Sequence, residues 1–92
     1  MTTKSEEQTS LLEFPCRFPI KAMGRNSDGF EALVTAIVLE HAQLWPDKEV
    51  TVAPSKEGNF ISVTVTIEAQ SRQQLDDIYQ DLTDSDQVMM AL

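Results

Sequence analysis

The 92-residue sequence contains one cysteine and one histidine, and this scarcity excludes several kinds of site. Cys16 has no second thiol, so the chain has neither an internal disulfide nor a CxxC metal or redox pair. His41 has no second histidine with which to form a zinc-binding helix motif. We therefore expect no metal, no cofactor and no catalytic role for either residue. Cys16 is interpreted as a small apolar side chain, and His41 as a helix-terminal residue that favours the helix dipole.

Basic residues and long apolar runs are also scarce. The chain has 7 Lys and Arg against 15 Asp and Glu, a net charge of −8. Proteins that bind a phosphate backbone normally carry a basic stripe, so we expect no nucleic-acid partner. The most apolar stretch, residues 32–39, is far shorter than the roughly 20 residues of a membrane span. The first ten residues lack the apolar core of a secretory signal, so we expect no membrane association and a cytoplasmic location.

The sequence that remains is typical of one small globular domain, with 41% hydrophobic residues. Residues 1–10 are polar and are predicted to form a disordered N-terminal tail. Residues 11–92 are predicted to form a single domain.

Apolar periodicity predicts four strands and two helices. The clearest strand is Phe60 to Ala69, in which apolar and polar residues alternate. Capping boxes at Asp28 with Glu31 and at Ser71 with Gln74 mark the two helix starts. The predicted elements are a strand over 17–24, a helix over 28–45, strands over 50–53 and 60–69, a helix over 72–83 and a strand over 88–92.

This β-α-β-β-α-β order predicts an α+β, ferredoxin-like sandwich. Right-handed crossovers place both helices on one face of a four-stranded antiparallel sheet. The first and third strands are expected to be central, and the other sheet face is expected to be open.

The second helix and its C-terminal end are rich in aspartate. The cluster lacks the spacing of a calcium loop, so we interpret it as a solvated face. The alternative is an electrostatic patch for a basic partner. Its members are Asp76, Asp77, Asp81, Asp84 and Asp86.

Three regions contain the candidate ligand- or partner-binding residues. Small hydroxyl residues on an open sheet face are either simple β-formers or a surface on which another chain packs. The Gly and Asn of the 54–59 loop either satisfy turn geometry or belong to a contact surface. The candidates are Lys21, Gly24, Arg25 and Asn26 at the first strand and its loop, Ser55, Lys56, Gly58 and Asn59 in the second loop, and Ser62 and Thr64 on the open face.

Several segments resemble the YbeD family of small bacterial proteins, over about residues 11–92. The matching segments are Leu11-Leu12-Glu13-Phe14-Pro15, Phe18-x-x-Lys21-x-Met23-Gly24, Pro54-Ser55-Lys56-x-Gly58-Asn59-Phe60-x-Ser62-Val63-Thr64-Val65 and Asp86-x-Val88-x-Met90-x-Leu92. The resemblance implies a ferredoxin-like fold similar to the ACT domains, which bind amino acids in metabolic enzymes. By that analogy of fold, a ligand would bind near Gly24-Arg25-Asn26, at the interface of a homodimer.

Three functions follow as hypotheses. The first is a non-enzymatic regulatory or interaction module that meets a protein partner or a small metabolite. The second is a sensor that binds an amino acid or another metabolite between two copies of the chain. The third is a phosphate-ester or acyl-phosphate hydrolase that would use Arg25 and Lys56, although no asparagine lies within 60–69, where acylphosphatases carry one.

Overall fold

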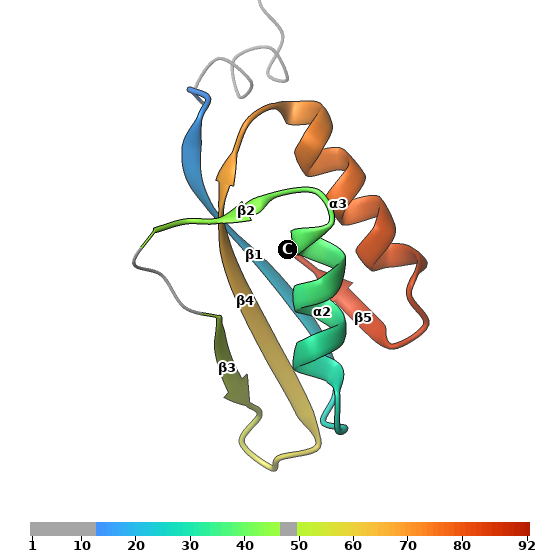
Figure 1. Ribbon diagram of the computed structural model, residues 1–92. Helices are drawn as coiled ribbons and strands as arrows, with labels where there is room; N and C mark the ends of the chain where they lie inside the picture. Colours follow the sequence, from blue (N-terminus) through green and yellow to red (C-terminus); the bar gives the residue numbers. More distant parts are fainter. Residues whose placement is uncertain (1–12, 47–49) are drawn as a thin grey trace, which may run out of the picture.

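The computed structural model describes residues 13–46 and 50–92. The predicted tail, residues 1–10, lies outside the described residues, as do Leu11 and Leu12 of the predicted domain. The elements are β1 (Cys16–Arg25), α2 (Phe30–Leu39), β2 (Gln43–Leu44), β3 (Thr51–Pro54), β4 (Phe60–Ala69), α3 (Arg72–Asp84) and β5 (Val88–Ala91), shown in Figure 1.

The sheet is built around two long central strands, as predicted. β1 and β4 pair antiparallel in one continuous register, from Cys16 opposite Ala69 to Arg25 opposite Phe60. β5 pairs antiparallel with the other side of β1, and β2 and β3 both pair antiparallel with the other side of β4. Both helices lie on the same side of this sheet, and no helix formed by the described residues covers the opposite face (Figure 1). The predicted two-layer α+β arrangement is therefore confirmed, but the described sheet has five strands and not the predicted four, because Gln43 and Leu44 add a short strand.

The core lies between the sheet and the two helices. Alternate β4 residues enter it because successive side chains of a strand point to opposite faces. β1 contributes Ile20 and Ala22, and Phe18 packs partly buried at the margin. The buried apolar residues are Ile20, Ala22, Phe30, Val34, Val38, Val63, Val65, Ile67, Ala69, Leu75, Ile78 and Leu82.

Gly24 is buried where β1 passes beneath the first residue of α2. A Cβ atom at this position would lie 2.4 Å from the Gln87 carbonyl oxygen and 2.6 Å from the Cε1 atom of the Phe30 ring. Real Cβ atoms essentially never approach that closely. The glycine is therefore required for packing, and its role as a binding residue stays a prediction.

The start of α2 differs from the prediction. The helix begins at Phe30, and its N-cap is Gly29, which has a φ of 86° and forms no side-chain capping bond. The predicted box of Asp28 with Glu31 is therefore wrong. The left-handed conformation of Gly29 turns the chain between Asp28 and Phe30, whose ring is fully buried.

The end of α2 also differs, because the helix stops at Leu39 and not at Trp45. Beyond the helix, Gln43 and Leu44 form β2 opposite Glu68 and Ile67 of β4. The Trp45 amide then donates to the Thr66 carbonyl over 2.9 Å. Backbone pairing with the free edge of β4 thus replaces continued helix, although the apolar spacing fits both.

Helix α3 follows its prediction closely. The Ser71 hydroxyl accepts a hydrogen bond from the Gln74 amide, as expected for an N-cap. Its apolar stripe of Leu75, Ile78 and Leu82 is buried. None of the helices formed by residues 13–46 and 50–92 is long and apolar enough to cross a membrane.

Candidate functional site

The two predicted binding loops meet at one end of the sheet. The Asn26 side chain donates from Nδ2 to the Gly58 carbonyl over 3.0 Å, and the Asn26 amide donates to the Asn59 carbonyl over 3.0 Å. The loop after β1 is thereby fastened to the hairpin between β3 and β4. Asn26 uses both its side-chain amide and its backbone amide in this contact.

The hairpin residues are explained largely by turn geometry. The Gly58 amide donates to the Ser55 carbonyl, and Gly58 has a φ of 79°, which favours glycine. The Ser55 hydroxyl accepts from the Phe60 amide over 3.1 Å. Ser55, Gly58 and Asn59 therefore shape the loop, and Lys56 is exposed within it.

The open face of the sheet unites the remaining predicted residues. Lys21 on β1 lies opposite Thr64 on β4, and Thr64 lies opposite Thr51 on β3. Ser62 lies opposite Met23, and its hydroxyl donates to the Ala53 carbonyl over 3.3 Å. The small hydroxyl residues thus form a row on the open face beside the β1 cations.

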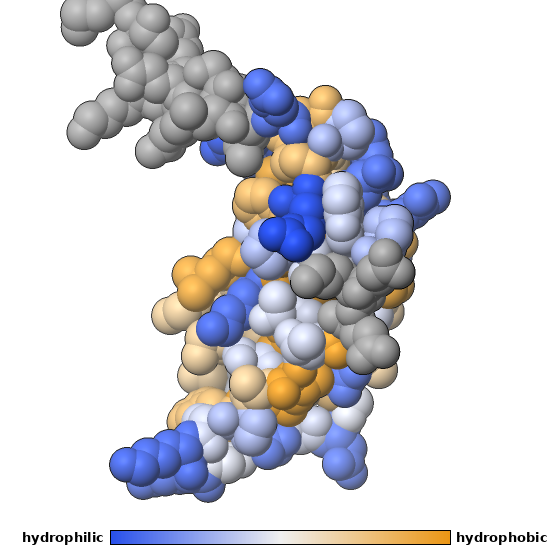
Figure 2. Space-filling model, turned by 90° about the vertical axis from the view of Figure 1, so that its left-hand side faces the viewer, coloured by the Kyte–Doolittle hydropathy of each residue, from blue (hydrophilic) through white to orange (hydrophobic). Residues whose placement is uncertain are grey.

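Apolar side chains are exposed at one end of the open face. Met23 lies opposite Met90 of β5, and Arg25 lies opposite Phe60 of β4. The exposed fraction is 38% for Phe60 and 53% for Met90. Leu92, which is 60% exposed, lies further along the face, where its backbone pairs with that of Lys21. A cavity of about 180 Å³ opens here, lined by Met23, Gly24, Phe60, Met89 and Met90. Figure 2, which looks at the left-hand side of Figure 1, shows hydrophobic patches among polar surface.

A second cavity adjoins the first through Met89. It has a volume of about 350 Å³ and is lined by Arg25, Ser27, Asp86, Gln87 and Met89. Arg25 and Asp86 bring opposite charges to the same opening. This cavity lies directly beside the loop after β1 that the fold analogy indicates.

Three cations occupy the open face in one line along β1. They are Arg17, Lys21 and Arg25, which are four residues apart on one strand. Because successive side chains of a strand alternate between its two faces, all three point away from the core. Among the described residues the ion pairs are Arg72 with Asp76 and His41 with Asp81, and neither uses these three. The sequence analysis named Lys21 and Arg25 but missed Arg17, although its four-residue spacing from Lys21 carries the signal.

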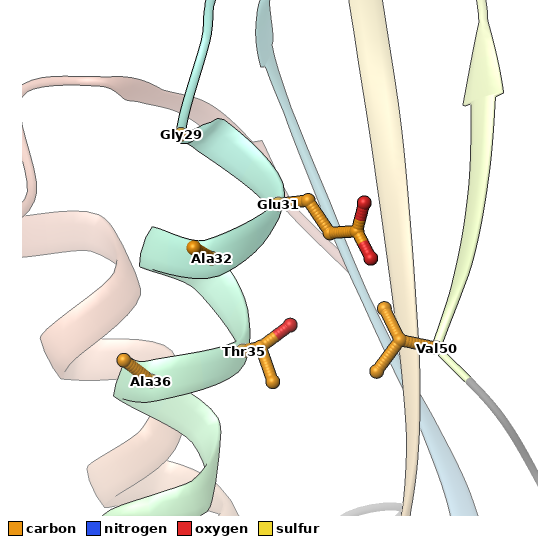
Figure 3. A pocket seen from close by; sticks show the side chains of 6 residues that line it. All are labelled: Gly29, Glu31, Ala32, Thr35, Ala36 and Val50. Atoms are coloured by element: carbon orange, nitrogen blue, oxygen red, sulfur yellow. The ribbon is translucent and has the colours of Figure 1, made fainter.

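A wider groove separates α2 from the start of β3. It has a volume of about 560 Å³ and is lined by Gly29, Glu31, Ala32, Thr35, Ala36 and Val50. Glu31 and Thr35 extend toward Val50 across the groove (Figure 3). These two side chains supply its polar groups, which form no convergent set for a specific ligand.

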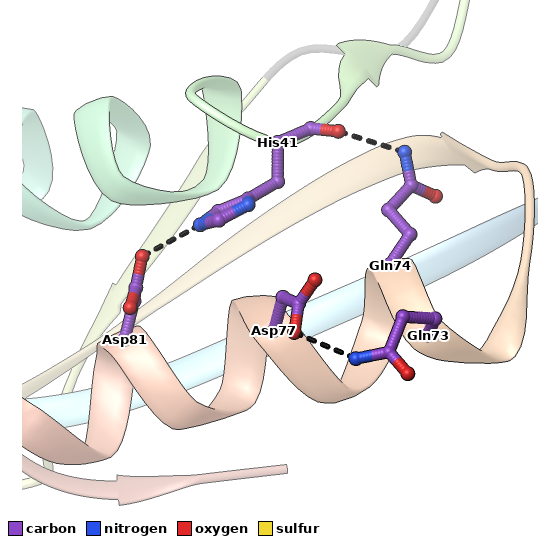
Figure 4. A network of polar contacts seen from close by, with 5 residues as sticks. All are labelled: His41, Gln73, Gln74, Asp77 and Asp81. Carbon is purple, nitrogen blue, oxygen red and sulfur yellow. Dashed lines mark hydrogen bonds and ion pairs between the residues drawn. The ribbon is translucent and has the colours of Figure 1, made fainter.

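His41 joins the end of α2 to α3. Its Nε2 atom lies 2.6 Å from Asp81 Oδ2, and its carbonyl accepts from Gln74 Nε2 over 2.8 Å (Figure 4). The Glu40 carboxylate is nearby, since potential ligand atoms of Glu40, His41 and Asp81 lie within 4.8 Å of one another. His41 and Asp81 already satisfy each other, so we interpret the group as an interhelical clamp. Elsewhere on α3, burial raises the pKa of Tyr79 above its usual value.

The clamp gives a stability prediction. Replacing Asp81 or His41 with Ala is expected to lower the free energy of unfolding by about 0.5–1.5 kcal/mol, the usual value of one side-chain hydrogen bond. The Asp81 side chain is 44% exposed, which favours the lower part of that range.

Urea denaturation of both single variants and the double variant measures the effect. If the two residues act as a pair, the double variant loses less than the sum of the single losses. Asp84→Asn is the control, because Asp84 is bonded to Gln80 within its own helix. Additive losses for His41 and Asp81 would contradict the clamp.

These features define a small α+β domain with a ferredoxin-like sandwich and an open, partly apolar sheet face. Residues 9–92 match the family model described as "Protein of unknown function (DUF493)", so the chain belongs to the DUF493 family. The resemblance to the YbeD family is confirmed, because YbeD proteins form the UPF0250 family to which the curated relatives belong.

The curated relatives match nearly the whole chain. A UPF0250 protein of Chromobacterium violaceum is 46% identical over 88 residues, covering 96% of this chain and 99% of its own. A UPF0250 protein of Nitrosomonas europaea is 45% identical and covers 92% of this chain and 98% of its own. A UPF0250 protein of Neisseria gonorrhoeae is 40% identical and covers 98% and 99%.

A solved structure confirms the ferredoxin-like fold. The solution structure of protein HP0495 from H. pylori matches with a TM-score of 0.68, covering 100% of this chain and 97% of that one. Its sequence identity of 16% supports a shared fold alone. The family description assigns no activity, so function has to be argued from the surface described above.

Proposed function

We propose that the chain is a non-enzymatic protein-interaction module whose open sheet face contacts a partner. The observation that carries this proposal is the exposure of Phe60 and Met90 at one end of that face, with exposed Leu92 further along it beside Lys21. Large apolar side chains clustered beside charged ones are typical of protein contact surfaces.

The arrangement of the strands supports a side-chain contact surface. β1 and β4 are paired on both edges, so their backbone groups are already used in the sheet. The side chains of Thr51, Ser62 and Thr64 in the middle of the face are small, so they leave room for a partner that packs onto the sheet. Apolar side chains at one end would add buried contact area to such a complex.

Site-specific photo-crosslinking in the bacterium that makes the protein tests the proposal. A benzophenone amino acid at Thr51, on the open face, is expected to give discrete adducts with a partner protein. The same group at the exposed Gln80 of α3 is the matched control and is expected to give none of them. Phe60→Ala is expected to reduce the Thr51 adducts, because it removes apolar contact area from the face.

Equal crosslinking from Thr51 and Gln80 would contradict the proposal. So would a yield of Thr51 adducts that Phe60→Ala leaves unchanged. A sensor of small metabolites is the second candidate, and the opposite charges of Arg25 and Asp86 at one cavity favour it. If a free amino acid causes saturable changes in the chemical shifts of the residues that line this cavity, and Thr51 gives no adducts, the sensor is the correct function and the interaction module is not.

A further inference from the structure

We propose that the open face binds an acidic amphipathic helix of a partner protein, with one large apolar side chain seated among the methionines beside Arg25. This inference rests on the proposed function and names the chemistry of the partner. An acidic partner is the opposite of what the net charge of −8 predicts by itself, because a negative chain is expected to attract a basic partner.

The charges of the chain are divided between its two faces. Arg17, Lys21 and Arg25 lie on the open face, where Glu68, opposite Arg17, is the acid of the two central strands. The helical side holds the excess of acid. Its described acidic residues include Glu31 and Glu40 of the α2 region and Asp76, Asp77, Asp81 and Asp84 of α3. A partner that approaches the open face therefore meets local positive charge.

The cations are free to bind a ligand. Within the described ranges no ion pair involves Arg17, Lys21 or Arg25, and all three side chains are exposed. In contrast, Arg72 of α3 is paired with Asp76. Unpaired cations beside apolar surface attract carboxylates and orient the partner.

The spacing of the cations fits a helix. Positions 17, 21 and 25 are four residues apart on one strand, which places successive charges about 13 Å from each other. Carboxylates on one face of a helix, seven or eight residues apart, are separated by about 11–12 Å. Pro19 and Met23 fill the intervals with apolar surface. A helix that presents acids seven or eight residues apart, with apolar residues between them on the same face, offers this alternation.

The cavity beside Arg25 provides the anchor point. Its volume of about 180 Å³ and its lining of Met23, Phe60, Met89 and Met90 suit one large apolar side chain. Methionine side chains are flexible and adapt to the group that enters. An apolar anchor with a neighbouring charge pair is the usual centre of an interface.

The same observations favour a protein over a nucleic acid. Single-stranded nucleic acid is bound by several aromatic platforms, and Phe60 is the aromatic residue of the two central strands on this face. The net charge of −8 repels a polyanion at long range, whereas a short acidic helix with an apolar face is held by contact.

Methyl NMR of the full chain tests the inference. The probe is a synthetic helix whose contact face carries glutamate every seven or eight residues with leucine between, and its control carries lysine at every glutamate position. The glutamate peptide is expected to shift the Met23 and Met90 methyl signals and to bind more weakly as salt rises. The combined variant R17E/K21E/R25E is expected to weaken binding by about tenfold or more. Arg72→Glu is the matched control and should leave affinity unchanged.

Three outcomes would overturn the inference. They are tighter binding of the lysine peptide at the open face, affinity unchanged by the combined variant, and stronger shifts of the same methyl signals by a single-stranded oligonucleotide. The crosslinking experiment separates this failure from that of the proposed function. Adducts from Thr51 that map to a basic or neutral partner segment would leave the interaction module standing and remove the acidic helix.

Discussion

Gly24→Ala is expected to destabilise the fold by about 1–3 kcal/mol, and Gly24→Val by more. The added Cβ would lie 2.4 Å from the Gln87 carbonyl oxygen, which belongs to the backbone, and 2.7 Å from the Cζ atom of the Phe30 ring. A flexible side chain could move away, but β1 and the chain entering β5 are held by strand pairing. The free energy of unfolding from urea denaturation measures the loss.

Gly58→Ala provides the contrast for this prediction. No atom lies within 4 Å of a Cβ at Gly58, so only its φ of 79° opposes alanine. Adding Phe30→Leu to Gly24→Ala removes the contact with the ring and leaves the contact with the carbonyl. If Gly24→Ala lowers the free energy of unfolding less in the Phe30→Leu background than in the wild type, but still lowers it, both contacts oppose the added methyl group. Wild-type stability of Gly24→Ala would show that the glycine is not required for packing.

Phe30→Ala is expected to have the largest effect of any single truncation considered, about 3–5 kcal/mol. Phe30 is fully buried, and its ring fills the space between α2 and Gly24. Losing it leaves a cavity that the rigid sheet cannot close. Thermal and urea denaturation are expected to show either a large fall in stability or failure to fold.

Phe60→Ala is the matched comparison, because it removes the same side chain from an exposed position. Phe60 is 38% exposed on the open face, so its loss is expected to cost about 1 kcal/mol or less. Its effect should appear instead in the crosslinks from Thr51. Equal destabilisation by the two truncations would contradict the division between a buried core and an open contact face.

The strands and α3 could be predicted from local pattern. The alternation from Ile61 to Ala69 specifies which residues are buried, and the structure buries those side chains wholly or in part. Ser71 and Gln74 form the predicted N-cap bond because both groups lie within one turn of chain. These features depend on neighbours in sequence, which a reader of the sequence can see.

The ends of α2 could not be predicted, because distant residues decide them. The apolar spacing of Leu44 and Trp45 continues that of the helix, but the edge of β4 draws this segment into the sheet. Gly29 takes the N-cap position that Asp28 was predicted to define, since Phe30 has to reach the core. At both ends of α2, contacts with residues distant in sequence override the local sequence pattern.

The candidate site was predicted in part. The two loops and the hydroxyl row were named, but the bond between Asn26 and Gly58 spans 32 residues and has no local signature. The pairing of His41 with Asp81 spans 40 residues and was missed for the same reason. The separation of charge between the two faces can be recognised only when it is known which side chains of β1 point away from the core.

The two outer edges of the sheet are short. On one side the edge strand is divided into the two-residue β2 and the four-residue β3, and on the other side β5 is four residues long with an irregular register near Gly24. Exposed strand edges are templates for uncontrolled pairing between molecules, and short or irregular ones offer few consecutive hydrogen-bonding groups. Edges this short give another molecule little to pair with, which lowers the tendency of the domain to aggregate through its sheet.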